Sequence, residues 1–145
     1  MLTIGQILFT KKSEIKTVSM DTPVEDACDI LAANRIGILV VTEPNGMVTG
    51  VLSERDIVKH VASRRNFYKL MVSDICTKKP VTCVRSDYVV DVLKDMKARH
   101  FRHMPVVEYT HLLGVVSIGD LYHHLLEEFG RDVLTEEWSK LDGYL

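Results

Sequence analysis

Serine and aspartate recur in one short pattern at two places in the chain. Gly50 to Asp56 reads Gly-Val-Leu-Ser-Glu-Arg-Asp, and Gly114 to Asp120 reads Gly-Val-Val-Ser-Ile-Gly-Asp. Each copy follows an apolar stretch, so each is predicted to lie where a strand passes into a helix. In that place Ser-x-x-Asp is first of all a helix N-cap, because the serine oxygen accepts from a backbone N–H and the acid favours the positive helix end.

The same pattern also suits a nucleotide. A helix N-terminus offers backbone N–H groups to a phosphate, a hydroxyl can donate to a phosphate oxygen, and a carboxylate can accept from both ribose hydroxyls. One copy would indicate capping alone. Because the residues occur twice in equivalent places, we interpret Ser53, Asp56, Ser117 and Asp120 as candidate ligand contacts as well as caps.

The two copies belong to a repeat that covers most of the chain. Thr17 matches Thr82 and Val24 matches Val89 at a constant offset, and one single-residue gap brings the two Ser-x-x-Asp copies into line. Hydrophobic periodicity predicts the order strand, helix, strand, strand, helix in each half. The expected strands are 15–19, 36–41 and 47–52, then 81–84, 104–107 and 112–116, with helices near 24–31 and 89–96 and from Ser53 and Ser117 onward.

Each of the two predicted sheets needs the other repeat to bury one of its faces. Neither half is large enough to cover both faces of a three-stranded sheet, so we expect an α/β fold in which two β-α-β-β-α repeats pack face to face around a shared cleft. The expected divisions are a lead-in over 1–8, repeats over 9–65 and 66–129, and an amphipathic tail over 130–145. Apolar residues at helical spacing in that tail predict packing on the body or on a second subunit; they are Val133, Leu134, Trp138 and Leu141.

Composition excludes several classes of protein. With 145 residues, 46% of them hydrophobic and 26% charged, the chain is typical of a globular domain. A net charge of −2 argues against general nucleic-acid binding. The apolar run 36–41 is too short to cross a membrane, and no signal segment opens the chain, so we expect a cytoplasmic protein without membrane attachment.

Chemistry beyond binding finds little support. The cysteines at 28, 76 and 83 are interpreted as reduced thiols within apolar surroundings. The adjacent pair His123 and His124 cannot easily share one ion, and no zinc-binding spacing is present, so no metal is expected. Cys83 and His103 lack an orienting third group, and phosphate-binding glycine loops are absent. We therefore expect no catalytic residues and no enzyme.

The sequence resembles a tandem pair of CBS (cystathionine-β-synthase) domains, also called a Bateman module, from about Ile4 to Phe129. The order and duplication of the motifs carry the resemblance: Thr17 with Val24 and Ala27, the run Ile36 to Val41, Gly50 to Asp56, Thr82, Arg102 to Val107, and Gly114 to Asp120. The resemblance implies a pseudo-two-fold pair that forms homodimers. It also implies clefts for AMP, ADP, ATP, NAD or S-adenosylmethionine.

The resemblance further implies that each cleft is composite. Carried over, the first site joins one helix start to the early strand and loop of the other repeat: Ser53, Arg55, Asp56, Thr82, Arg102, His103, Met104 and Pro105. The second site is made in the same way from Thr17, Ile36, Gly37, Ile38, Ser117 and Asp120. Arg102 offers a planar fork for phosphate, whereas the second set holds no cation. We therefore expect the first site to bind a mono- or polyphosphate, with Met104 and Pro105 beside the adenine ring. The second should be weaker or take the less charged end of a larger ligand.

Two functions remain open at this point. One is a nucleotide-sensing regulatory module that acts by ligand-dependent conformational change on itself or on a partner protein. The other is a structural module in which the Ser-x-x-Asp elements are only caps and the function is homodimerisation through the helices.

Overall fold

In the computed structural model of the protein, residues 1–12, 14–63 and 66–130 are described. The predicted tail over 130–145 lies outside these residues except for Gly130. The first half holds β1(Thr17–Val18), α2(Val24–Asn34), β2(Ile38–Thr42), β3(Val48–Ser53) and α3(Glu54–Ala62). The second half holds α5(Val89–Arg99), β5(His103–Glu108), β6(His111–Ser117) and α6(Ile118–Phe129). Around these lie α1(Ile4–Thr10), the 3-10 turn η1(Phe67–Lys69), α4(Val72–Ile75) and β4(Thr77–Lys78).

The first half forms a four-stranded sheet in the order β1-β2-β3-β4. β1 runs parallel to β2, while β3 is antiparallel to both of its neighbours. The predicted hairpin is present between β2 and β3, where Gly46 takes a positive φ of 87° and Glu43 N–H donates to the Met47 carbonyl over 2.9 Å. Asn-Gly therefore sets this turn as the sequence indicated.

The second half repeats the hairpin as β5 and β6, paired antiparallel. The strand predicted over 81–84 is shorter than expected: only Cys83 pairs with the sheet, in a parallel bridge to Val106. Its backbone N–H donates to the Pro105 carbonyl over 3.0 Å, and its carbonyl accepts from Val107 over 2.9 Å. Burial raises the pKa of the Cys83 thiol to about 12, which leaves it protonated and unreactive.

Short segments cross between the halves. α1 precedes the first repeat in sequence, yet Ile4 and Ile7 are fully buried in the hydrophobic core of the second half. In the mirrored exchange, Val72 and Ile75 of α4 are buried in the core of the first half. Neither α4 nor β4 is predictable from the sequence pattern, because such short elements carry too few residues for a periodicity.

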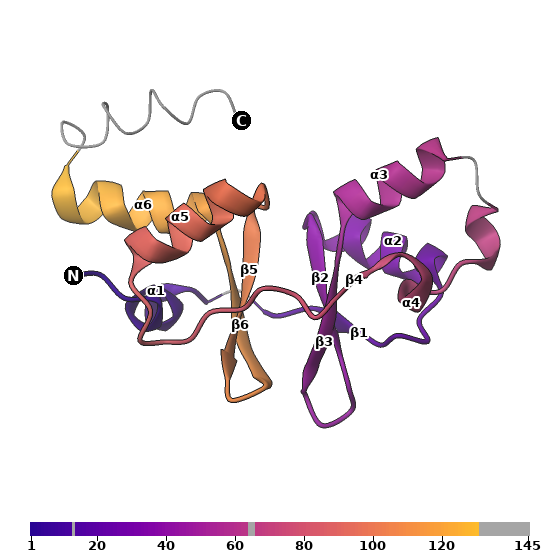
Figure 1. The fold of residues 1–145 in the computed structure, drawn as a ribbon, viewed down its shortest axis with the longest axis horizontal. Helices are drawn as coiled ribbons and strands as arrows, with labels where there is room; N and C mark the ends of the chain where they lie inside the picture. Colours follow the sequence, from indigo (N-terminus) through magenta and orange to yellow (C-terminus); the bar gives the residue numbers. More distant parts are fainter. Residues whose placement is uncertain (13, 64–65, 131–145) are drawn as a thin grey trace.

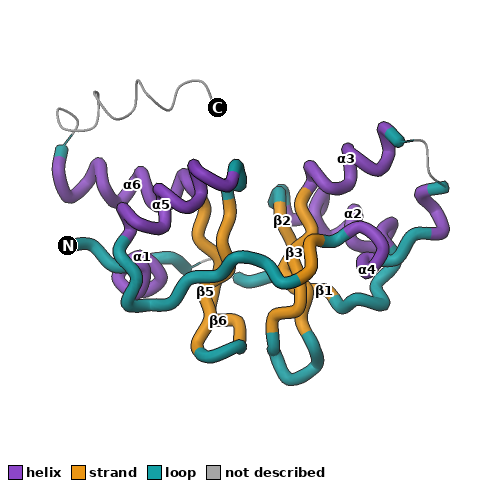
Figure 2. Tube along the Cα trace, viewed as in Figure 1, coloured by secondary structure: helices purple, strands orange, loops and turns teal. Residues whose placement is uncertain are grey.

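The strands lie in the middle of the molecule and the helices on the outside (Figure 1). α1, α5 and α6 cover the second half, and α2, α3 and α4 cover the first, with loops that pass from one half to the other (Figure 2). The tips of the two hairpins also touch, through a bridge between Met47 and His111. The predicted α/β pair of repeats is confirmed.

The packing of α1 into the second core should contribute measurably to the free energy of unfolding. Ile7→Ala removes a fully buried side chain from the second core and should lower the free energy of unfolding by about 2–5 kcal/mol in urea denaturation. Phe9→Ala on the same helix is the control, because Phe9 is 89% exposed and its loss should change stability by less than about 0.5 kcal/mol. Equal losses for the two variants would show that α1 does not complete that core.

Candidate functional site: two clefts between the repeats

Both Ser-x-x-Asp elements fold as capping boxes at strand-to-helix junctions. At the start of α3, Asp56 N–H donates to Ser53 Oγ over 3.2 Å, and Ser53 N–H donates back to the Asp56 carboxylate over 2.9 Å. At the start of α6, the corresponding distances for Ser117 and Asp120 are 3.1 Å and 2.8 Å. The capping reading is therefore correct for both copies, and these contacts hold each carboxylate at the helix start.

Each capping box also opens onto a cavity that spans the two repeats. The cavity at Ser117 and Asp120, which we call the C-terminal cleft, measures about 470 Å³. Its opposite wall comes from the first repeat, as the family resemblance implied. The residues from that wall and the N-terminal segment are Gly5, Leu8, Phe9, Lys11, Glu14, Ile15, Lys16, Arg35, Ile36, Gly37 and Ile38.

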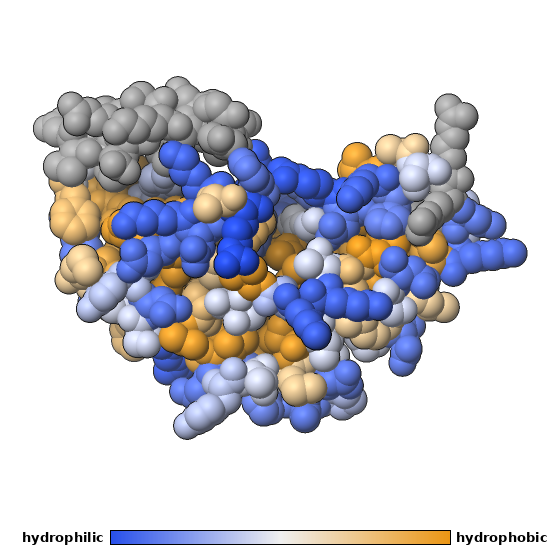
Figure 3. Space-filling view, in the orientation of Figure 1, coloured by the Kyte–Doolittle hydropathy of each residue, from blue (hydrophilic) through white to orange (hydrophobic). Residues whose placement is uncertain are grey.

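The second cavity, which we call the N-terminal cleft, lies at Ser53 and Asp56 and measures about 350 Å³. The second repeat supplies its facing wall from the end of α5 and the start of β5, together with the loop before Thr82. These residues are Pro80, Val81, Arg99, His100, Phe101, Arg102, His103 and Pro105. Figure 3 shows a hollow between the two halves with hydrophilic rims.

Three residues line both cavities and so form the wall between them: Gly37, Ile38 and His103. Ile38 and His103 occupy equivalent places, each paired with the capping serine of its own hairpin. Burial lowers the pKa of His103, and Lys11 lowers it further, although Asp120 partly opposes this. The imidazole is therefore neutral at neutral pH and can act as either a donor or an acceptor toward a ligand.

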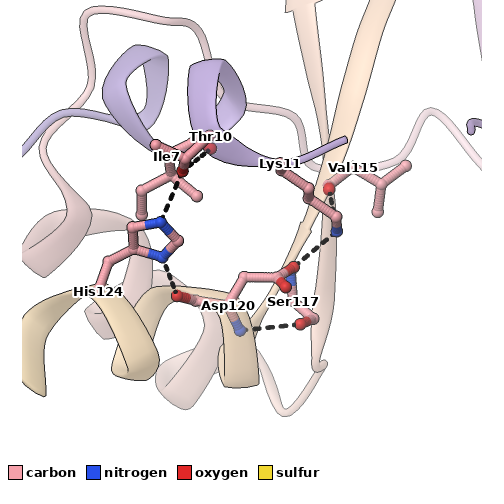
Figure 4. Close-up of polar contacts among 7 residues, drawn as sticks. All are labelled: Ile7, Thr10, Lys11, Val115, Ser117, Asp120 and His124. Atoms are coloured by element: carbon pink, nitrogen blue, oxygen red, sulfur yellow. Dashed lines mark hydrogen bonds and ion pairs between the residues drawn. The ribbon is translucent and has the colours of Figure 1, made fainter. Parts of the chain in front are cut away.

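The C-terminal cleft contains an ion pair to its aspartate, and the described part of the chain offers no such pair to Asp56. Lys11 Nζ donates to the Asp120 carboxylate over 2.7 Å and to the Val115 carbonyl over 2.9 Å (Figure 4). Burial alone would raise the pKa of Asp120, but the hydrogen bonds from Lys11 and Ser117 outweigh burial and hold it below its usual range. Asp120 is thus ionised at neutral pH.

Several predicted residues lie where the resemblance implied. Those that line the N-terminal cleft are Ser53, Arg55, Asp56, Arg102, His103 and Pro105. Those that line the C-terminal cleft are Ile36, Gly37, Ile38, Ser117 and Asp120. In addition, Arg55 Nη1 donates to the His100 carbonyl over 3.1 Å, which ties the start of α3 to the opposite repeat.

Three predicted residues do not line either cavity. Met104 is 1% exposed and belongs to the second hydrophobic core, because it points away from the side of β5 that His103 and Pro105 present to the cleft. Thr17 and Thr82 are exposed, and the residue before each lines a cavity instead, namely Lys16 and Val81. Alternation along an extended chain explains this displacement by one residue.

The expectation that the second site lacks a cation was wrong. Four cationic side chains line the C-terminal cleft, which are Lys11, Lys16, Arg35 and Arg85. They come from the end of α1, the loop after it, the end of α2 and the loop before α5. None is part of the repeated motif, so motif matching could not find them. Arg35 sits at a left-handed helix C-cap with φ 52°, and the repeat gives His100 the same conformation in the other cleft.

The described residues contain neither a candidate metal cluster nor a candidate membrane-spanning helix. Among the described residues, no three histidine, cysteine or acidic side chains are grouped so that they could hold a metal ion. No helix within those residues is both long enough and apolar enough to cross a bilayer.

The lowered pKa of Asp120 predicts a pH-dependent stability. A carboxyl whose pKa is lower in the folded than in the unfolded state stabilises the fold above the unfolded value of about 3.9, and that contribution is lost as the pH falls. The stability difference between wild type and Asp120→Asn should therefore shrink as urea unfolding is followed from about pH 6 to pH 3. A difference that stays constant over this range would contradict the ion pair.

Comparison with known proteins identifies the family to which this chain is related. The CBS domain family matches residues 4–63 and 72–127. The uncharacterized 17.7 kDa protein in the bps2 3' region of Acidianus ambivalens is 35% identical over 142 residues, which cover 94% of this chain and 78% of that protein. CBS domain-containing protein CBSCBSPB5 of Arabidopsis thaliana is 32% identical over 118 residues, or 81% of this chain. The match spans only 22% of that plant protein, so the chain corresponds to about a fifth of it.

Solved structures agree with the fold. The CBS-domain containing protein ATU1752 from Agrobacterium tumefaciens is 34% identical with a TM-score of 0.80, covering 86% of this chain and 99% of that one. CBS domain protein PAE2072 from Pyrobaculum aerophilum, solved in complex with AMP, is 28% identical with a TM-score of 0.76, covering 87% and 97%. The chain therefore belongs to the CBS domain family and carries two CBS domains in tandem.

Proposed function

We propose that this protein binds an adenine nucleotide in the clefts between its two CBS domains and acts as a non-catalytic regulatory module of the AMP, ATP or NAD class. The observation that carries the proposal is the duplication of a serine-aspartate pair, each opening onto a cavity built from both repeats. A ligand in such a cavity contacts both repeats at once, so it can change how the repeats sit against each other.

The chemistry of the clefts supports a nucleotide. Each cleft combines a carboxylate that can accept from ribose hydroxyls, a serine beside a helix start, and apolar surface for a base. Ile15 and Ile36 supply that surface in the C-terminal cleft, and Val81 and Pro105 supply it in the N-terminal cleft. The cationic side chains of both clefts suit a phosphate.

The Pyrobaculum relative, solved with AMP, makes AMP the first ligand to test. The ranking of the clefts changes from the one expected on sequence. Because four cations line the C-terminal cleft, we propose that it binds the phosphate at least as well as the N-terminal cleft does.

Homodimerisation through the helices is the second candidate. Apolar side chains are exposed on α3 and α6: Val58 by 66%, Val61 by 53% and Phe129 by 50%. A second copy of the chain would cover them, in line with the assembly that the resemblance implies. This candidate is compatible with nucleotide binding but does not require it.

Replacing both cleft aspartates separates binding from capping. AMP at about 100 times its dissociation constant adds about 2.7 kcal/mol to wild-type stability and should raise the melting midpoint by about 5 °C or more in a thermal-shift panel of AMP, ADP, ATP, NAD, NADH and S-adenosylmethionine. Asp56→Ala with Asp120→Ala should lose about 1 kcal/mol of stability per cap and should also lose this shift.

Asp74→Ala provides the matched control. Asp74 accepts from the Met71 backbone N–H over 2.8 Å at the start of α4, as Asp56 and Asp120 accept on their helices, but it lines neither cleft. The variant should lose stability and keep the full nucleotide shift. If no compound in the panel shifts the wild-type midpoint at millimolar concentration, nucleotide binding is excluded and the assembly role is left.

A further inference from the structure

The two clefts differ at one position beside their aspartates. α1 and α4 are the two crossing helices, and their C-caps are Lys11 and Cys76. Lys11 donates to Asp120, as described above. Burial chiefly raises the pKa of the Cys76 thiol, although Lys78 opposes this, and the thiol lies 3.6 Å from Met20 Sδ at the edge of the first core. Equivalent helix ends therefore carry an ammonium that contacts Asp120 in one half and a neutral thiol packed against the core in the other.

We propose that Lys11 contacts the bound ligand and makes the C-terminal cleft select phosphorylated adenosyl compounds over unphosphorylated ones. The inference rests on the proposed function and adds a specificity-determining residue to it. Lys11 lies outside the Ser-x-x-Asp motif and reaches the cleft only because α1 crosses to the second half.

The Lys11 ammonium can donate a further hydrogen bond to a ligand. Of its three N–H groups, one donates to the Val115 carbonyl over 2.9 Å and one to Asp120 over 2.7 Å. The third is available to a phosphate oxygen, since Lys11 lines the cavity with its side chain 25% exposed. A side chain already held by two contacts loses little conformational entropy when the ligand arrives.

The end of α1 is itself fixed to α6. Thr10 Oγ1 lies 2.7 Å from His124 Nε2, and His124 Nδ1 lies 2.9 Å from the Asp120 carbonyl oxygen (Figure 4). Because a carbonyl oxygen only accepts, Nδ1 carries a proton in this contact. These bonds, together with the buried Ile7, keep the backbone of Lys11 at the mouth of the cleft.

The ion pair does not remove Asp120 from ligand binding. An ionised carboxylate has about four acceptor positions, so the contacts from Ser117 and Lys11 leave room for a ribose hydroxyl. A nucleotide could then bind sugar to the carboxylate and phosphate to the ammonium without breaking their contact. Adenosine, which has no phosphate, would use only the first of these two interactions.

The other cations of the cleft act in the same direction but are held differently. Lys16 pairs over 3.0 Å with Glu14, whose side chain is 80% exposed, and Arg35 and Arg85 are exposed to solvent. Screening by water weakens an exposed charge more than the half-buried one on Lys11. Lys11 is therefore the cation whose removal should change selectivity most.

The test is calorimetric titration of AMP and of adenosine into the full chain carrying Asp56→Ala, so that only the C-terminal cleft binds. Adding Lys11→Gln should weaken AMP about tenfold or more and change adenosine by less than about threefold. Lys11→Arg keeps the charge and should keep the preference for AMP. Lys12→Gln removes the same charge from the exposed neighbour and should change neither ligand.

Each other outcome has a definite meaning. Equal weakening of AMP and adenosine by Lys11→Gln would overturn the proposal and make Lys11 a positioning residue for Asp120. No change in either dissociation constant would overturn it as well. Failure of both ligands to bind when Asp56→Ala is present and Lys11 is intact would instead count against the proposed function of this cleft.

Discussion

The structure depends on the burial that each repeat obtains from the other. A hairpin and two helices leave the core of one repeat incomplete, and α1 and α4 complete the two cores by crossing over. Ile4 and Ile7 close the second core, and Val72 and Ile75 close the first. The approach is close, because a Cβ on Gly50 would lie 2.9 Å from the Thr77 carbonyl oxygen, and one on Gly114 would lie 2.7 Å from the end of the Leu8 side chain, which would have to shift. Glycines inside β3 and β6 thus let the crossing segments pack.

This exchange also creates the clefts. The segments that cross over bring their ends to the start of α3 and α6, where the capping boxes hold Asp56 and Asp120. Stability and binding therefore use the same residues for different purposes: a cap satisfies the helix start, and the same carboxylate remains at the edge of a cavity. The shared wall of Ile38 and His103 places the two cavities back to back, so a ligand in one lies against residues that also line the other.

The sequence predicted what repeats and missed what differs between the repeats. The strand, helix and hairpin pattern and the two Ser-x-x-Asp caps are local, so periodicity and turn chemistry were sufficient to find them. Lys11 and Arg35 reach the C-terminal cleft through packing between segments that are distant in sequence, and no local pattern reports such a contact. Met104 shows the opposite error, since a motif position does not say which side of a strand a side chain occupies.

The most direct test of the account is a crystal structure of the protein grown with saturating AMP. The account predicts density for AMP in at least one cleft, with its ribose hydroxyls on Asp56 or Asp120 and its phosphate among the cationic side chains. Empty clefts, or AMP bound only elsewhere on the surface, would contradict the central claim that these clefts are nucleotide sites.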